Sequence, residues 1–245
     1  MIPDRLFIEN HRGRRVPRIL GFVLAAGGAI GAVAVGVSDH VPAAGWIAAA
    51  GAVFVVAAGL LDDLSSNGPR GLRGHLRALT AGHVGTGIVK LFTIVAVAVV
   101  TVASSPSGRS GSVRLSGVIL IAAATNLWNG LDVRPGRALK FGYLAAPALL
   151  TCGWPSVPFA PGVLLASVLV LPWDVGERAM LGDTGANLLG FTIGVALFDA
   201  LTDTQVVVAA GIGVILNVLA ETVTLSRLID AVPPLRWYDR LGGAP

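Results

Sequence analysis

The sequence predicts an all-α, polytopic membrane protein of one domain, with about eight transmembrane helices and a cleft that faces the cytoplasm. Hydrophobic residues make up 54% of the 245-residue chain and charged residues only 13%, whereas a soluble domain carries about 25% charged residues. Long uncharged runs recur along the chain, such as the one from Val41 to Leu61. Basic residues gather in alternate connections between these runs. Together these observations exclude a soluble domain.

The apolar runs define the expected helices. A helix that crosses a bilayer needs about 17 to 25 predominantly apolar residues. Runs near this length predict spans at 17–37, 43–61, 86–103, 115–131, 139–152, 160–174, 186–201 and 205–226. The fifth and sixth runs are short, so a broken or tilted helix is the alternative for each. Abundant glycine and alanine within the runs favour close packing of helices in lipid.

The basic residues predict the orientation of these spans. With the amino terminus inside, only Arg109 and Arg114 lie on outward-facing segments, Lys90 lies about one turn within the third span, and the remaining basic residues face inward. Basic residues favour the cytoplasmic side, so both termini are expected in the cytoplasm. The same loops explain the net charge of +4. Neither a zinc-ligand spacing nor an RNA-binding signature accompanies them, so we expect no nucleic-acid partner.

Two adjacent carboxylates, Asp62 and Asp63, stand at the inner end of the second expected span. Neighbouring carboxylates repel each other unless a cation lies close by. At a membrane boundary they suit a Mg²⁺ site, or a metal ligand beside a general base. The alternative is a solvated start of a loop that simply ends the helix.

Polar residues at spacing three mark the inner end of the fourth expected span. On a helix, Asn126, Asn129 and Asp132 lie near one face, where polar groups in a membrane protein typically line a cavity. Because arginine contacts phosphate through two parallel hydrogen bonds, the basic turn that follows suits a phosphate clamp. The alternative is an ordinary helix end with basic anchors. The turn holds Arg134, Arg137 and Lys140.

Two further polar patterns lie at inner helix ends. Asp183 stands in a Gly-Asp-Thr-Gly turn before the seventh span, where glycine permits close approach of a ligand and a carboxylate suits a helix start. The alternative is a simple helix cap by Asp183 or Thr184. Asn217, Glu221 and Thr224 follow helical spacing in the last span. Glu221 is a functional candidate or a structural partner of a basic residue.

All these patterns lie on the expected cytoplasmic side. Carboxylates from separate helices, together with bases suited to phosphate, indicate a divalent metal and a nucleotide or pyrophosphate substrate. Phosphoryl transfer requires this combination, because it depends on positioning and on neutralisation of charge rather than on covalent chemistry by the protein.

The motifs, in their order along the chain, resemble those of the polyprenyl-phosphate sugar-1-phosphate transferases. That family includes the phospho-MurNAc-pentapeptide translocase and the GlcNAc-1-phosphate transferases. The resemblance covers most of the chain. It rests on NHRGRRVPRILG at 10–21, GLLDDL at 59–64, RGLRGHLRAL at 70–79 with GTGIVK at 85–90, NLWNGLD at 126–132, LGDTGANLLG at 181–190 and ET at 221–222.

The resemblance implies a Mg²⁺-dependent transferase in the bacterial cytoplasmic membrane. Such an enzyme moves a sugar 1-phosphate from a UDP-sugar to undecaprenyl or decaprenyl phosphate and releases UMP, in cell-wall or surface-polymer synthesis. A homodimer follows only by analogy with larger relatives.

The resemblance also implies roles for individual residues. Asp183 would bind Mg²⁺, with Asp63 as a second ligand, and Asp62 and Asp63 would act on the lipid phosphate. Lys90 and Arg77 would neutralise phosphate charge. The expected substrate-binding residues are Asn126, Asn129, Asp132, Arg134 and Arg137.

The chain departs from the family's pattern at several positions. Asn129 stands where the family has an aspartate, Val133 where it has a glycine and Ala186 where it has a serine. The tail after 229 lacks the family's histidines. One alternative is therefore a homologue that binds lipid phosphate or a partner without turnover, and another is a transferase acting on a different activated lipid. A transporter is a further alternative, although it would need polar residues nearer the middle of the membrane.

Overall fold

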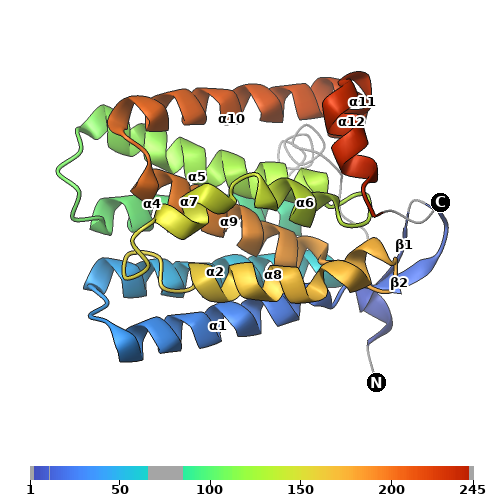
Figure 1. Cartoon of the computed structure of the whole chain (residues 1–245), viewed down its shortest axis with the longest axis horizontal. Coiled ribbons are helices and arrows are strands. Elements are labelled where there is room, and N and C mark those ends of the chain that lie inside the picture. The colour runs from blue at the N-terminus through green and yellow to red at the C-terminus, as the bar shows by residue number, and fades with distance from the viewer. Residues whose placement is uncertain (1–2, 11, 66–84, 243–245) are drawn as a thin grey trace.

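Helices of the expected kind dominate the computed structural model, which describes residues 3–10, 12–65 and 85–242 (Figure 1). Five of the described helices are long and apolar enough to cross a membrane, which makes the chain a multi-pass membrane protein. They confirm five of the expected spans to within a few residues. These helices are α1 (Leu20–Ser38), α2 (Ala43–Leu64), α4 (Thr86–Ser104), α5 (Gly111–Leu131) and α10 (Asp203–Val223).

The helix α9 (Gly182–Ala200) lies at the centre of the bundle, packed against α1, α2 and α5. Nearly all of its residues are buried, including the polar Asn187 and Thr192. Helix α9 can hold these polar side chains because protein, rather than lipid, surrounds it. Gly190 permits its closest approach to α5, since a Cβ atom there would lie 2.7 Å from the carbonyl oxygen of Ala124.

The remaining expected spans differ in form from a full crossing helix. The helix α8 (Ala160–Val175) has 16 residues, and the run at 139–152 is broken into α6 (Arg137–Tyr143) and α7 (Ala146–Thr151). Pro147 explains the break, because it has no backbone N–H to continue a helix from α6. Neither short piece can cross a bilayer alone.

A small hairpin precedes α1, and the sequence did not predict it. The 3-10 turn η1 (Asp4–Leu6) leads into β1 (Phe7–Glu9), which pairs antiparallel with β2 (Arg15–Pro17). The strand β2 continues toward the loop before α9: the amide of Met180 donates to the carbonyl of Pro17 at 2.9 Å. The amino-terminal segment therefore helps to fix the start of the central helix.

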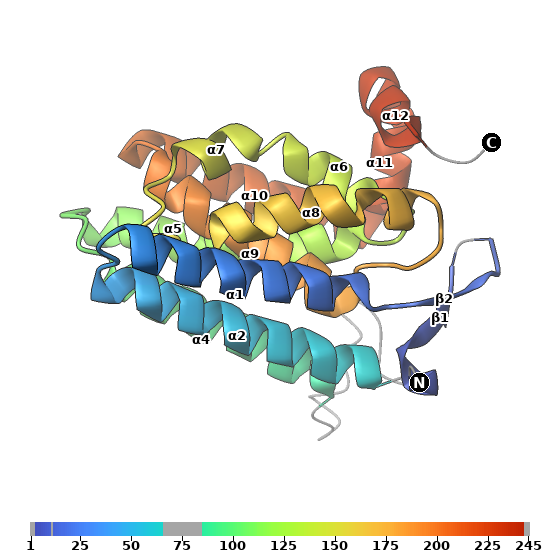
Figure 2. The same cartoon turned by 60° about the horizontal axis from the view of Figure 1, so that its bottom comes forward.

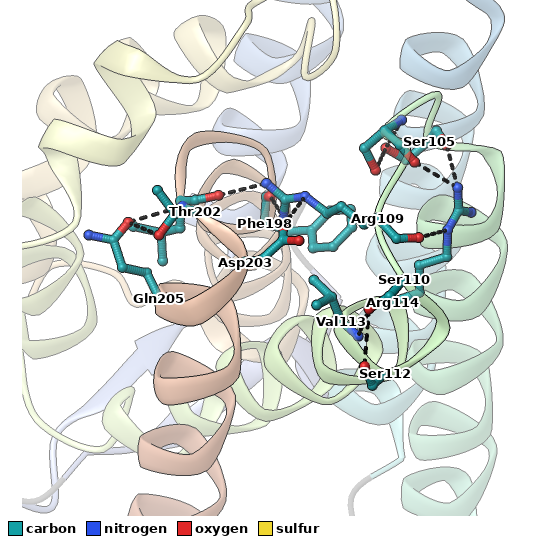
Figure 3. Close-up of polar contacts among 12 residues, drawn as sticks. Ser105, Arg109, Ser110, Ser112, Val113, Arg114, Phe198, Thr202, Asp203 and Gln205 are labelled. Atoms are coloured by element: carbon teal, nitrogen blue, oxygen red, sulfur yellow. Dashed lines mark hydrogen bonds and ion pairs between the residues drawn. The ribbon is translucent and has the colours of Figure 1, made fainter.

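At the opposite end of the bundle, two arginines hold the ends of helices (Figure 3). Arg109 donates to the carbonyls of Phe198 and Leu201, each at 2.6 Å, and pairs with Asp203 at 3.3 Å. The last carbonyls of a helix have no partner within it, and a cation there is favourable. Arg109 is one of the two exceptions to the inward bias of basic residues, and these contacts give it a structural role. Arg114 likewise donates to the carbonyls of Val102, Ala103, Ser105, Ser107 and Arg109.

The chain ends in two short helices, α11 (Leu225–Ala231) and α12 (Pro233–Arg240). Figures 1 and 2 place both at the end of the bundle that also holds the amino-terminal hairpin, turned across the direction of the long helices. The carboxyl ends of α2 and α5 and the amino end of α9 lie at this same end, which is the inner end expected from the charges.

Candidate active site

Four polar side chains from four helices meet at the inner end of the bundle. They form what we call the inner cluster: Asp62 of α2, Lys90 of α4, Asn129 of α5 and Asp183 of α9. The ammonium of Lys90 bridges the two carboxylates, with Nζ 2.5 Å from Asp62 Oδ2 and 2.5 Å from Asp183 Oδ2. All four residues were expected from the sequence to belong to the site.

Three further contacts fix the orientation of the inner cluster. The hydroxyl of Thr86 donates to Asp62 Oδ1 at 2.6 Å. The amide of Asn129, with its nitrogen toward the carboxylate, donates to Asp183 Oδ1 at 3.1 Å and accepts from Lys90 Nζ at 3.3 Å. Asn129 thus occupies a position beside Asp183 where an aspartate would add a negative charge.

The inner cluster is shielded but open to a ligand. The exposed fractions of its charged side chains are 12% for Lys90, 19% for Asp62 and 29% for Asp183. Two carboxylates face one ammonium, so the cluster keeps a net negative charge when all three groups are ionised. Asp183, the most exposed, is the side chain best placed to meet an incoming cation.

Asp63 points away from the inner cluster and into the protein, where it is fully buried. Its Oδ1 accepts from the amide of Asp183 at 3.0 Å, and its Oδ2 accepts from the amide and the hydroxyl of Thr184 at 2.9 and 2.7 Å. Arg18 Nη1 lies 3.0 Å from Asp63 Oδ1, and Arg18 also donates to the Asp63 carbonyl. Asp63 therefore caps the amino end of α9 from another helix.

This cap replaces the simple one considered from the sequence. Neither Asp183 nor Thr184 caps α9 with its own side chain. Gly182 has φ of +67°, and a Cβ atom there would lie 2.9 Å from Asp63 Oδ2. Only glycine fits this turn without strain. The role of Asp63 as a metal ligand stays a prediction, and its two oxygens are already engaged.

Asp132 adds a further carboxylate just beyond the end of α5. Its Oδ1 is buried without a hydrogen-bond partner. Burial, followed by the charges of Asp174, Asp183 and Asp63, raises the pKa of Asp132 well above its usual range, against a hydrogen bond from the Gly182 backbone. A cation bound among these carboxylates would lower that pKa and favour the charged form of Asp132.

Asn126, which was also expected to bind substrate, lies on α5 but outside the inner cluster. Asn126 donates to Asn217 Oδ1 of α10 at 2.6 Å, and Asn217 donates to the carbonyls of Ala123 and Gly213 at 3.0 and 2.8 Å. The first two of these three bonds join α5 to α10, and none of them involves a residue of the inner cluster. Arg77 lies outside the described residues.

Arg134, Arg137 and Lys140 form a second group, which we call the C-terminal clamp together with Asp230 and Asp239. Arg137 is fully buried, and its Nε and Nη2 each lie 2.8 Å from an oxygen of Asp239. Arg134 Nη2 donates to Asp230 at 3.2 Å. Lys140 donates to the carbonyls of Asp239 and Leu241. The predicted phosphate contacts of Arg134 and Arg137 stay predictions, since both already pair with carboxylates of α11 and α12.

The charges within the C-terminal clamp favour a stable contact between Asp239 and its basic partners. Burial acts to raise the pKa of Asp239, but hydrogen bonding and charge from Arg137, with the charges of Lys140 and Arg134, outweigh burial and lower that pKa. A carboxylate held in its charged form by a buried arginine is costly to separate.

Two residues that hold the site were missed in the sequence. Arg18 was counted only as a basic anchor, and Thr86 only as part of a motif. Their partners, Asp63 and Asp62, are distant along the chain, so no local spacing reveals the contacts. Comparison with models of known families, with curated proteins and with solved structures finds no match to this chain.

Proposed function

We propose that the protein transfers a sugar 1-phosphate from a UDP-sugar to a polyprenyl phosphate, with Mg²⁺, at the cytoplasmic face of a bacterial membrane. In this proposal all eight apolar segments lie within the membrane, with α6 and α7 as a broken segment packed on the bundle. The products are UMP and a sugar linked to lipid through pyrophosphate.

The observation that carries the proposal is the convergence of Asp62, Lys90, Asn129 and Asp183 from four helices at one end of the bundle. Ionisable residues within membrane segments are expensive and mark functional sites by default. Two carboxylates bridged by one lysine, at the depth of lipid headgroups, can serve a reaction in which both substrates carry phosphates.

The oxygens at this end of the bundle fit Mg²⁺. In the part of the chain that the structure describes, no group of three or more Asp, Glu, His or Cys side chains is arranged to hold a metal alone. Mg²⁺, however, is commonly held by one or two carboxylates together with water and substrate phosphates. The partly exposed carboxylate of Asp183 and the unpartnered oxygen of Asp132 are donors of this type.

The reaction that we propose is an in-line displacement. An oxygen of the lipid phosphate attacks the β-phosphorus of the UDP-sugar, the bond from that phosphorus to the bridging oxygen breaks, and UMP leaves. Lys90 moves its hydrogen bonds from the carboxylates to phosphate oxygens and neutralises their charge. Asp62 orients the acceptor phosphate and takes its proton when it arrives protonated. Bound Mg²⁺ would neutralise the pyrophosphate and assist departure of UMP.

The surface beside the inner cluster suits a lipid acceptor. Leu61, Val89 and Phe92 are exposed hydrophobic residues next to Asp62 and Lys90 in the sequence of α2 and α4. A prenyl chain lying in the bilayer along these helices would bring its phosphate to the inner headgroup level. The water-soluble nucleotide would arrive from the cytoplasm.

A role in binding without turnover is the second candidate. It is favoured by Asn129, whose amide takes the position where the family has a second carboxylate. It is also favoured by the C-terminal clamp, which already engages Arg134 and Arg137. Under this reading the inner cluster would hold a lipid phosphate without transferring to it.

The test is release of UMP by purified protein supplied with undecaprenyl phosphate, Mg²⁺ and a panel of UDP-sugars. The proposal expects release with at least one donor and loss of about 10²–10³-fold in Asp183→Ala. The control is Asp39→Asn, which changes an exposed carboxylate at the carboxyl end of α1, the end away from the inner cluster. Lipid phosphate binding without UMP release from any donor would favour the second candidate.

A further inference from the structure

The short helix α12 has two different faces. Leu235, Tyr238 and Asp239 face the protein: Leu235 packs against the hydrophobic core, and Asp239 is buried. The opposite face is exposed and consists of Arg236, Trp237 and Arg240, with 66% of Trp237 accessible to solvent. We call these three residues the outer face of α12. It has two cations, one large aromatic ring and no acid.

The inward contacts fix how α12 is turned. Arg137 donates two hydrogen bonds to Asp239, each of 2.8 Å, and these bonds hold the last turn of α12 in place. The hydroxyl of Tyr238 donates to the Lys140 carbonyl at 2.7 Å, and its ring meets Phe141 edge-on at 5.6 Å between centroids. Because Asp239 is the one acid of α12 and is neutralised internally, the charge on the outer face is purely positive.

The position of α12 relative to the long helices matches a membrane surface. Figures 1 and 2 show it at the inner end, across the direction of the bundle and at its periphery. The short helix α11 separates it from α10. The helix α10 is the least buried of the five candidate spans, with 11% of its apolar window covered by protein. It therefore faces lipid over most of its surface, and α12 follows at the level where the headgroups begin.

We propose that the outer face of α12 binds anionic phospholipid headgroups of the inner leaflet. Tryptophan prefers the interface between lipid and water, and arginine near an anionic leaflet is attracted to its surface. A basic helix with one aromatic anchor that lies along the surface has both properties. The surface lies apart from the inner cluster, so this proposal is independent of the proposed reaction.

The expected selectivity is modest and measurable. Each arginine near an anionic surface gives roughly a fivefold preference for anionic over neutral lipid. The two arginines of the outer face together should give a preference of roughly twentyfold at low salt, which falls as added salt screens the charges.

The experiment measures the fluorescence of Trp237 in the full-length protein reconstituted into lipid bilayers. The bilayers contain phosphatidylcholine brominated near its headgroup end, either alone or mixed with phosphatidylglycerol brominated at the same place. Subtracting the signal of Trp237→Phe isolates Trp237 from the four other tryptophans of the chain. The charge variant is the double substitution Arg236→Gln with Arg240→Gln. The control is Arg14→Gln, an exposed arginine of the hairpin.

The proposal expects bromine to quench Trp237, more strongly when phosphatidylglycerol is present. The double variant should lose that dependence on anionic lipid, and Arg14→Gln should keep it. Equal quenching in both bilayers would overturn the proposal, as would free access of aqueous acrylamide to Trp237 with no quenching by lipid. Shielding from both lipid and acrylamide would also overturn it and would indicate contact with another protein chain.

Discussion

Lys90 is the residue on which the charge balance of the site depends. Its ammonium is the cation between Asp62 and Asp183, at 2.5 Å from each, and its side chain is largely buried. Without it, two partly buried carboxylates would face each other with no positive charge between them, which is strongly unfavourable. The same ammonium is the group that we expect to meet substrate phosphate.

Replacing Lys90 by glutamine should therefore lower UMP release by about 10²–10³-fold, because a preorganised charge at the phosphates is lost. Lys90→Arg keeps the charge and should retain more activity than Lys90→Gln. The measurement is the initial rate with the donor found in the panel. Wild-type turnover in folded Lys90→Gln protein would show that Lys90 is not part of the reaction.

Asn129→Asp should make the protein's stability depend on Mg²⁺. A carboxylate at this position cannot donate to Asp183 Oδ1 and brings a like charge to about the same distance as the amide. We expect a loss of about 1–3 kcal/mol in the free energy of unfolding without Mg²⁺, and recovery when Mg²⁺ is added. Thermal unfolding with and without the ion measures both.

The matched control for this prediction is Asn126→Asp, one turn earlier on α5. Its amide faces Asn217 instead of the inner cluster. That variant should lose stability whether or not Mg²⁺ is present. Equal responses of the two variants to Mg²⁺ would contradict the proposed location of the ion.

For single residues, the sequence predicted which residue types meet at the site, but not which partner each side chain contacts. Adjacent side chains on a helix point about 100° apart, so Asp62 and Asp63 could not both face one cluster. The sequence does not reveal which one turns inward, because the partners that decide it, Lys90 and Arg18, come from distant parts of the chain. Arg134 and Arg137 are a similar case, because their partners Asp230 and Asp239 are about a hundred residues away.

The start of α9 is the element on which the site is built. Asp63 accepts three hydrogen bonds from Asp183 and Thr184 and pairs with Arg18. It thereby satisfies amides that would otherwise be orphans at a helix end. The same bonds fix the backbone of Asp183, the expected metal ligand. In this arrangement Asp63 is a positioning residue.

Asp63→Asn should therefore lower the free energy of unfolding by about 3–5 kcal/mol, since it breaks a buried ion pair and weakens the cap. Asp62→Asn should cost less stability, because Asp62 is partly exposed and caps no helix. Its larger effect should be on UMP release. Chemical denaturation compares the two, and equal loss of stability in both variants would contradict this division of roles.

For the elements, the long apolar runs predicted helices to within a few residues, and of the two short runs one matches α8 while the other is broken. The five helices from α1 to α10 that could cross a membrane follow directly from long, predominantly apolar runs. The run at 139–152 is also mostly apolar, but Pro147 breaks it. The hairpin formed by β1 and β2 has strands of three residues. Such strands are too short for an alternating pattern to stand out, and their contact with Met180 is long-range.

The two ends of the molecule hold different sets of polar contacts. Arg109 and Arg114 complete the helix ends at one side, while the inner cluster and the C-terminal clamp lie at the other. The bias of basic residues predicted this division, because it is a property of the entire chain and not of any local contact.

The orientation predicts how single cysteines react in cells. With Cys152 replaced by alanine, Gly108→Cys should react with a membrane-impermeant maleimide in intact cells. Arg14→Cys, on the hairpin, should react only after the cells are permeabilised. Both positions are exposed, so a difference in labelling reports the side of the membrane. The reverse pattern would place the inner cluster outside the cell and remove its access to nucleotide.

The most direct test of the central claim follows the β-phosphate of the donor. A UDP-sugar with radioactive phosphorus at the β position is incubated with the protein, Mg²⁺ and undecaprenyl phosphate, and the products are separated into lipid and water. Transfer predicts that the label enters the lipid fraction in an amount equal to the UMP released, and that Asp183→Ala lowers both by about 10²–10³-fold. Label that stays entirely in the aqueous fraction, with folded protein and an effective donor panel, would contradict the assignment as a transferase.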